Sequence, residues 1–140
     1  MLGLAVDGRL SYLGWGISLA GESQVTAYFF GHKNATVAFG LGFQVNEPFG
    51  LKRTTFSIYD GPSYSFDPPR TVIWYHHLVL PAWRKKFENY VSFEFAAELP
   101  NSERWDAVLR FYHRSGAWGL YNTVDDDGLA VGLGVRYRFH

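Results

Sequence analysis

Apolar and polar residues alternate along much of the chain, with the two-residue period of a β-strand that has one apolar face. The alternation is cleanest over residues 129–139, where leucine, valine, tyrosine and phenylalanine take the odd positions and alanine, glycine and arginine the even ones. Residues 35–45, 91–99 and 105–115 follow the same design. These segments predict strands with one apolar and one polar or small-residue face.

Weaker alternation covers residues 2–13, 16–30 and 53–66, and residues 71–80 are rich in β-prone side chains without alternating. Counting the last segment gives about eight strands. No stretch shows the 3.6-residue stripe of an amphipathic helix, and no internal repeat is visible. The pattern therefore predicts an all-β, antiparallel, up-and-down fold.

Composition narrows the class of protein. The chain has 140 residues, which fits one domain spanning 1–140, and 19% of them are aromatic. No run approaches the roughly eighteen apolar residues of a spanning helix. The formal net charge of zero favours no nucleic-acid partner, and cysteine is absent. The first residues lack a basic segment followed by an apolar one, which counts against export unless an upstream signal peptide or N-terminal segment is missing.

The apolar strand faces are easiest to understand in a membrane barrel. The expected connections alternate between short ones (31–34, 67–70, 100–103) and longer ones (46–52, 81–87, 116–126), an asymmetry typical of outer-membrane barrels. The inward faces would carry charges that pair to fill a narrow lumen, as a plug rather than an ion pathway: Arg9, Glu22, Glu94, Glu98, Arg110, Arg114, Arg136 and Arg138. We therefore expect a small transmembrane β-barrel in the bacterial outer membrane.

Strand 105–115 ends in a pair of residues with catalytic chemistry. Alternation places His113 and Ser115 on the apolar face of the strand, with Phe111, while Arg110 and Arg114 take the opposite face. Residues two apart lie about 6 to 7 Å apart along a strand, so the two side chains can lean into a hydrogen bond. An alternative without chemistry is a rim pair that bonds lipid headgroups or loop backbone.

The segment His113-Arg114-Ser115-Gly116, followed by Ala117-Trp118-Gly119-Leu120, resembles the His-x-Ser signature of the lipid A 3-O-deacylase family, and residues 132–139 resemble the family's final strand. The resemblance implies an eight-stranded barrel with its active site on the lipid-facing outer wall. It further implies that Ser115 attacks an acyl ester of lipid A or lipopolysaccharide in the membrane lipid, that His113 is the general base, and that no cofactor takes part.

The family also implies a third, acidic residue and an oxyanion hole. Its glutamate at the start of the last strand matches Asp127 when counted from the serine, and Leu129 when counted back from the C-terminus; Asp125 and Asp126 are further candidates. Gly116 and Gly119 match the oxyanion segment, although the family's asparagine after the serine is missing and Gly119 falls one residue late.

Two other classes of protein stay open. One is a non-catalytic outer-membrane barrel with a structural or adhesive role, and the other is a soluble barrel that binds a lipid inside, with its apolar faces inward. No metal site is expected, because His76 and His77 have no further ligands at suitable spacing. The sequence leaves open whether the chain forms a homodimer.

Overall fold

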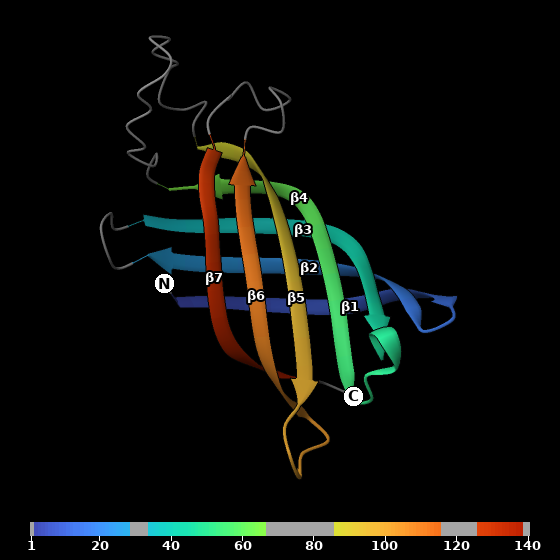
Figure 1. The fold of residues 1–140 in the computed structure, drawn as a ribbon. Helices are drawn as coiled ribbons and strands as arrows, with labels where there is room; N and C mark the ends of the chain where they lie inside the picture. The colour runs from blue at the N-terminus through green and yellow to red at the C-terminus, as the bar shows by residue number, and fades with distance from the viewer. Residues whose placement is uncertain (1, 29–33, 67–85, 116–125, 139–140) are drawn as a thin grey trace.

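The computed structural model describes residues 2–28, 34–66, 86–115 and 126–138, and these form an all-β fold (Figure 1). A short 3₁₀ turn, η1, covers Pro48–Gly50. The strands are β1 (Leu2–Gly14), β2 (Ile17–Tyr28), β3 (Asn34–Asn46), β4 (Thr54–Ser65), β5 (Phe87–Glu98), β6 (Trp105–Ser115) and β7 (Asp126–Tyr137). The alternating segments of the sequence thus form strands, and the bounds of β6 are those predicted.

Each described strand pairs with the next one along the chain, always antiparallel, in a single sheet of order β1-β2-β3-β4-β5-β6-β7. The predicted all-β, up-and-down arrangement is confirmed, and the described residues supply seven of the about eight predicted strands. In this sheet β4 pairs directly with β5, from Thr54 opposite Ala97 to Tyr64 opposite Phe87, so no further strand lies between them. The predicted strand 71–80 lies outside the described residues.

Three links lie at one end of the sheet: residues 15–16, 47–53 and 99–104. The predicted alternation of short turns on one side and longer loops on the other puts 46–52 and 100–103 at opposite ends of the sheet. That prediction is wrong, because β4 pairs directly with β5 and both links therefore lie at the same end. Gly14 (φ 105°), Trp15 (φ 52°) and Gly16 (φ 78°) form the first of these turns, where left-handed backbone favours glycine. The links β2 to β3, β4 to β5 and β6 to β7 leave from the opposite end.

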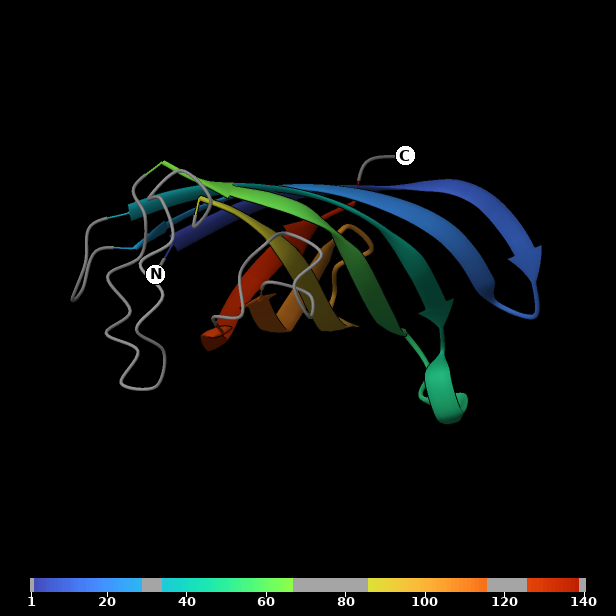
Figure 2. The ribbon, with the colours of Figure 1, turned by 90° about the horizontal axis from the view of Figure 1, so that it is seen from above.

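The sheet is strongly curved. Figure 2 shows it as an arch, and in Figure 1 strands β5, β6 and β7 cross in front of β1, β2 and β3. Two glycines allow β3 and β4 to come close where the sheet bends: a Cβ at Gly42 would lie 1.7 Å from the carbonyl oxygen of Ile58, and one at Gly61 would lie 2.0 Å from that of Phe39. Any larger residue at these positions would force the backbones apart.

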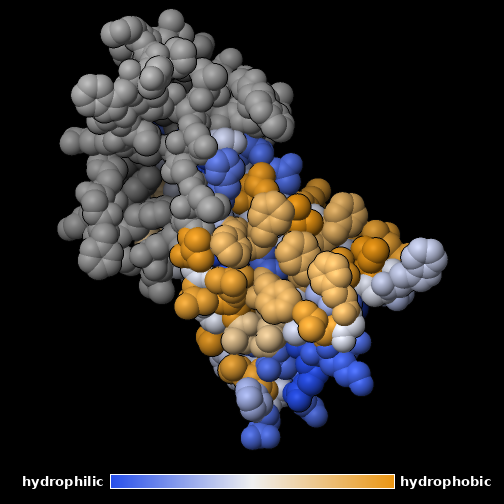
Figure 3. Space-filling view, viewed as in Figure 1, coloured by the Kyte–Doolittle hydropathy of each residue, from blue (hydrophilic) through white to orange (hydrophobic). Residues whose placement is uncertain are grey.

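The convex face of the sheet is apolar and exposed. Leu4 is 71% exposed, Leu41 63% and Leu133 87%, and many more large apolar side chains accompany them. Figure 3 shows such side chains gathered in a broad patch over the strands at the front of Figure 1. Contiguous apolar surface of this extent marks a face that contacts lipid or another apolar partner.

The concave face is polar and charged. Arg110 on β6 reaches across to β2, where its Nη1 donates to Gln24 Oε1 at 3.0 Å and its Nη2 pairs with Glu22. Arg136 on β7 lies 3.9 Å from Asp7 on β1. Side chains thus join strands at opposite margins of the sheet across its concave face.

Few apolar side chains are buried between these faces. The buried apolar cluster consists of Ala20, Ala38, Tyr59, Tyr90 and Tyr112. Among the described residues, no helix has the length and apolar character needed to cross a bilayer.

Candidate functional site

His113 and Ser115 lie on the convex face, at the end of β6 remote from the 99–104 turn. Exposed Phe111 precedes them on the same face, and Arg114 between them is buried on the concave side. His113 and Ser115 are half-buried. Across the sheet, His113 pairs with Val91 and Ser115 with Asn89 on β5. The predicted placement of the pair on the apolar strand face is confirmed.

The pairing of β6 with β7 is irregular at this position. His113 pairs with Leu129 and Ser115 with Asp126, so two residues of β7 stand opposite the one residue Arg114. This is the arrangement of a β-bulge, which bends a strand and redirects side chains, and bulges are frequent beside active sites. The irregularity coincides with the two residues that have catalytic chemistry.

Of the other predicted site residues, the structure describes only backbone positions or nothing at all. Asp127 is the second residue of β7, next to the residue that pairs with Ser115, and only its backbone position is described. Gly116 and Gly119, the expected oxyanion residues, lie outside the described residues, as do Asp125, His76 and His77. Leu129, the alternative to Asp127, pairs with His113 in the backbone register.

The structure adds two polar residues to this face that the sequence patterns did not single out. Asn89 Nδ2 donates a hydrogen bond to Asp60 Oδ1 at 2.7 Å, from β5 to β4. Asp60 shares its face with Phe56, Ile58 and Tyr64 by strand parity, and Asn89 is the direct neighbour of Ser115. In the sequence, the carboxylate of Asp60 among apolar residues of the same parity was the signal that could have singled out this position.

Behind this face, the concave charges form paired groups. Arg114 Nη2 lies 2.9 Å from Glu88 Oε2, and both side chains are almost fully buried. Arg110 contacts both Glu22 and Glu94. Buried charges are tolerated when they are paired in this way.

A second group of pairs involves Arg136 and Arg138. Arg136 contacts Glu94 and Asp106, each at 2.8 Å, and Arg138 contacts Glu98 at 2.7 Å. With the pairs above, the prediction that inward charges are paired is confirmed for every residue predicted to take part except Arg9, which is exposed.

Glu98 lies at the end of β5, beside the 99–104 turn. Two hydrogen bonds lower the pKa of its carboxyl group, the larger effect coming from Arg53 and the smaller from Arg138. The side chain is partly accessible to solvent, so these ion pairs are screened by water and salt.

The described residues contain no group of three or more histidine, aspartate or glutamate side chains arranged to hold a metal ion. The features that the structure defines are a single antiparallel up-and-down sheet with an apolar convex face, a charged concave face and a histidine–serine pair on the apolar side. Comparisons with protein-family models, with curated proteins and with solved structures find no match to this chain.

Proposed function

We propose that this chain forms a small β-barrel in the bacterial outer membrane and hydrolyses an acyl ester of lipid A on its lipid-facing wall. The observation that carries the proposal is the position of His113 and Ser115 on an exposed apolar face while the ion-paired charges occupy the other face. An enzyme that acts on a membrane lipid from the barrel wall needs its nucleophile on the outside.

The inverted polarity of the sheet supports a membrane setting. In water, a fold with Leu133, Leu4 and Val135 exposed and Glu22, Glu94 and Asp106 buried would be unfavourable on both faces. In a bilayer, both faces are satisfied, because lipid covers the apolar side chains and ion pairs fill the interior. The soluble lipid-binding barrel does not fit, because it needs the apolar side chains on the concave face.

The proposed chemistry is acyl transfer followed by hydrolysis. His113 takes the hydroxyl proton of Ser115 as the serine oxygen attacks the ester carbonyl carbon, and the same proton then goes to the departing alcohol. Water, activated by His113, cleaves the acyl-serine and releases the fatty acid. Asp127 is the candidate for orienting His113, and Gly116 and Gly119 are the candidates for stabilising the oxyanion.

The test is mass spectrometry of lipid A incubated in detergent with the refolded protein, with Ser115→Ala and with the control Ser11→Ala. Ser11 is an exposed serine of β1. Loss of one acyl chain with the unmodified protein and the control, but not with Ser115→Ala, is the expected result. Intact lipid A in all three samples, with heat-modifiable gel mobility showing that each is folded, would favour the second candidate, a non-catalytic structural or adhesion barrel.

A further inference from the structure

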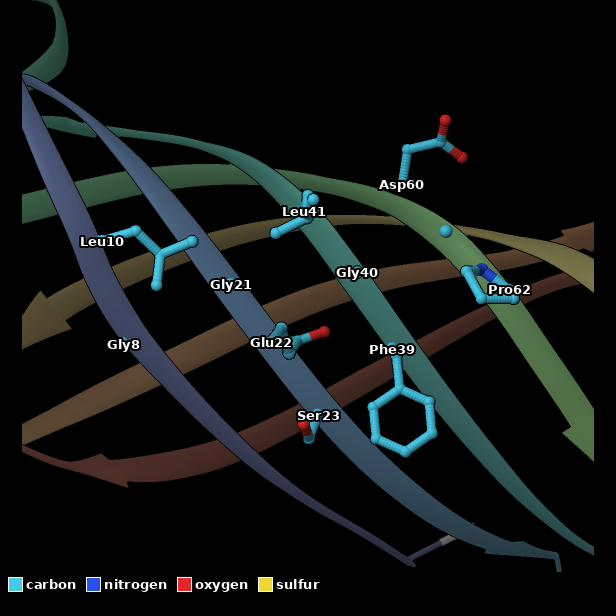
Figure 4. A pocket seen from close by; sticks show the side chains of 11 residues that line it. Gly8, Leu10, Gly21, Glu22, Ser23, Phe39, Gly40, Leu41, Asp60 and Pro62 are labelled. Atoms are coloured by element: carbon cyan, nitrogen blue, oxygen red, sulfur yellow. The ribbon is translucent and has the colours of Figure 1, made fainter.

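The convex face carries a shallow hollow lined by residues of β1 to β4. It has a volume of about 630 Å³ (Figure 4). Gly8 and Gly21 form its floor, because they have no side chains to fill it, and Leu10, Phe39 and Leu41 form its sides. The volume falls within the range of about 300–1,000 Å³ that is usual for small-molecule sites.

Strand register connects this hollow with the histidine–serine pair. Leu41 pairs with Asp60, Asp60 with Val91, and Val91 with His113, so these residues form one row across β3 to β6. In the next row, Asn89 pairs with Ser115. Strands are spaced by about 4.8 Å, so Asp60 lies roughly 10 Å across the sheet from His113.

Asp60 and Asn89 stand between the two features. The hydrogen bond from Asn89 engages Oδ1 of Asp60, whereas Oδ2 makes no hydrogen bond to any residue that the structure describes. Asp60 is exposed and also contributes to the lining of the hollow. A carboxylate on a lipid-facing surface is costly, and such residues mark functional positions when they are found.

The chemistry of the pair indicates what it binds. A carboxylate oxygen accepts hydrogen bonds from hydroxyl groups and repels phosphate, and an asparagine amide both donates and accepts. Asn89 is a direct cross-strand neighbour of Ser115, at a Cβ separation of about 5 Å, so one lipid molecule can reach both residues.

We propose that Asp60 and Asn89 bind a hydroxyl-bearing headgroup of the lipid whose ester lies at Ser115, and that the adjoining hollow holds part of an acyl chain of that lipid. This inference rests on the proposed function and extends it from the cleaved bond to the recognition of the substrate. Asp60 and Asn89 are positioning residues, and a sugar-based lipid suits them better than a phospholipid whose headgroup has no hydroxyl.

The test measures binding apart from hydrolysis. Folded Ser115→Ala protein in detergent is titrated with lipid A or with phosphatidylcholine, and complexes are quantified by native mass spectrometry. We expect preference for lipid A, a roughly tenfold loss of lipid A affinity with Asp60→Asn or Asn89→Leu, and no change for phosphatidylcholine. In the protein with Ser115 intact, the same two changes raise KM for lipid A more than they lower kcat.

The hollow is tested by filling it. A Cβ at Gly8 would meet no atom within 4 Å, so we expect Gly8→Phe to be accepted there. Ala107→Phe is a control on the same face, near the start of β6. Gly8→Phe is expected to weaken lipid A binding severalfold, and Ala107→Phe to leave it unchanged.

The outcomes separate the inference from the proposed function. Selective binding of lipid A without hydrolysis by the unmodified protein would refute the esterase and keep this site. Hydrolysis with unchanged affinity and KM in Asp60→Asn and Asn89→Leu would refute this site and keep the esterase. Equal affinity of the Ser115→Ala protein for both lipids would overturn the inference without further variants.

Discussion

The ion pairs that join β2 to β6 allow a quantitative test. Arg110→Met removes the cation that contacts Glu22 and Glu94, whose side chains are 0% and 3% exposed. Glu94 keeps Arg136 at 2.8 Å, so only Glu22 loses its cationic partner. Breaking a buried pair from one side costs about 3–5 kcal/mol, and with one stranded carboxylate we expect the lower end, about 3 kcal/mol. That is about a hundredfold in the folding equilibrium.

The assay is urea unfolding of the protein in detergent micelles, monitored by tryptophan fluorescence. Arg110→Met combined with Glu22→Gln is expected to recover at least half of the loss, because the stranded charge is gone. Arg104→Met, at an exposed arginine of the 99–104 turn, is the control and should change the free energy of unfolding by less than about 1 kcal/mol. The reasoning fails if Arg110→Met costs under about 1 kcal/mol, or if the double variant is as unstable as the single one.

Three further predictions concern other parts of the sheet. Gly42→Ala should lower the free energy of unfolding by about 1–3 kcal/mol, because its Cβ meets the backbone of β4, whereas Gly134→Ala meets nothing and should stay within about 0.5 kcal/mol. Leu133→Arg should cost about 2–4 kcal/mol in lipid vesicles if the convex face contacts lipid near mid-bilayer, and Phe49→Arg, at a fully exposed turn residue, should cost little. The lowered pKa of Glu98 adds stability that is fully present above the ordinary glutamate range and is lost as the pH falls through that lowered pKa, so Glu98→Gln should reduce the fall in urea midpoint between pH 7 and pH 3.

Each of these has a clear contrary result. Equal stability of the two glycine variants would mean that the close approach of β3 and β4 does not constrain position 42. A cost for Leu133→Arg no larger than that for Phe49→Arg would argue that water, and not lipid, covers the convex face. An unchanged pH dependence in Glu98→Gln would assign acid sensitivity to other carboxylates.

The strands were predictable where one face is clearly apolar. In residues 105–115 the apolar residues Trp105, Ala107, Leu109 and Phe111 share one parity and all the charged residues share the other, and β6 has those bounds. The neighbours of each strand were harder to predict: β-prone composition indicates what a segment favours, but the direct pairing of β4 with β5 is a long-range contact that no local window contains. The link 47–53 was expected at the wrong end of the sheet for the same reason, because its predicted position relative to 99–104 depended on how β4 and β5 are paired.

The candidate site was predictable only in part, for a similar reason. His113 and Ser115 share a strand, so parity alone places them on one face. Asp60 and Asn89 come from β4 and β5, and they meet each other and Ser115 only through the register of three strands. In the sequence, Asp60 also interrupts an apolar series and so looks like a break in the pattern instead of a feature of that face.

The scarcity of buried apolar side chains has a consequence for how this chain folds. Most domains collapse in water because apolar groups gather inside, but here the interior offers mainly charges and hydroxyls to one another. The groups that would drive collapse stand on the outside and find partners only in a surrounding apolar phase. If the chain folds in a membrane as proposed, insertion and folding become a single event, and before that event its apolar strands need protection from aggregation with one another.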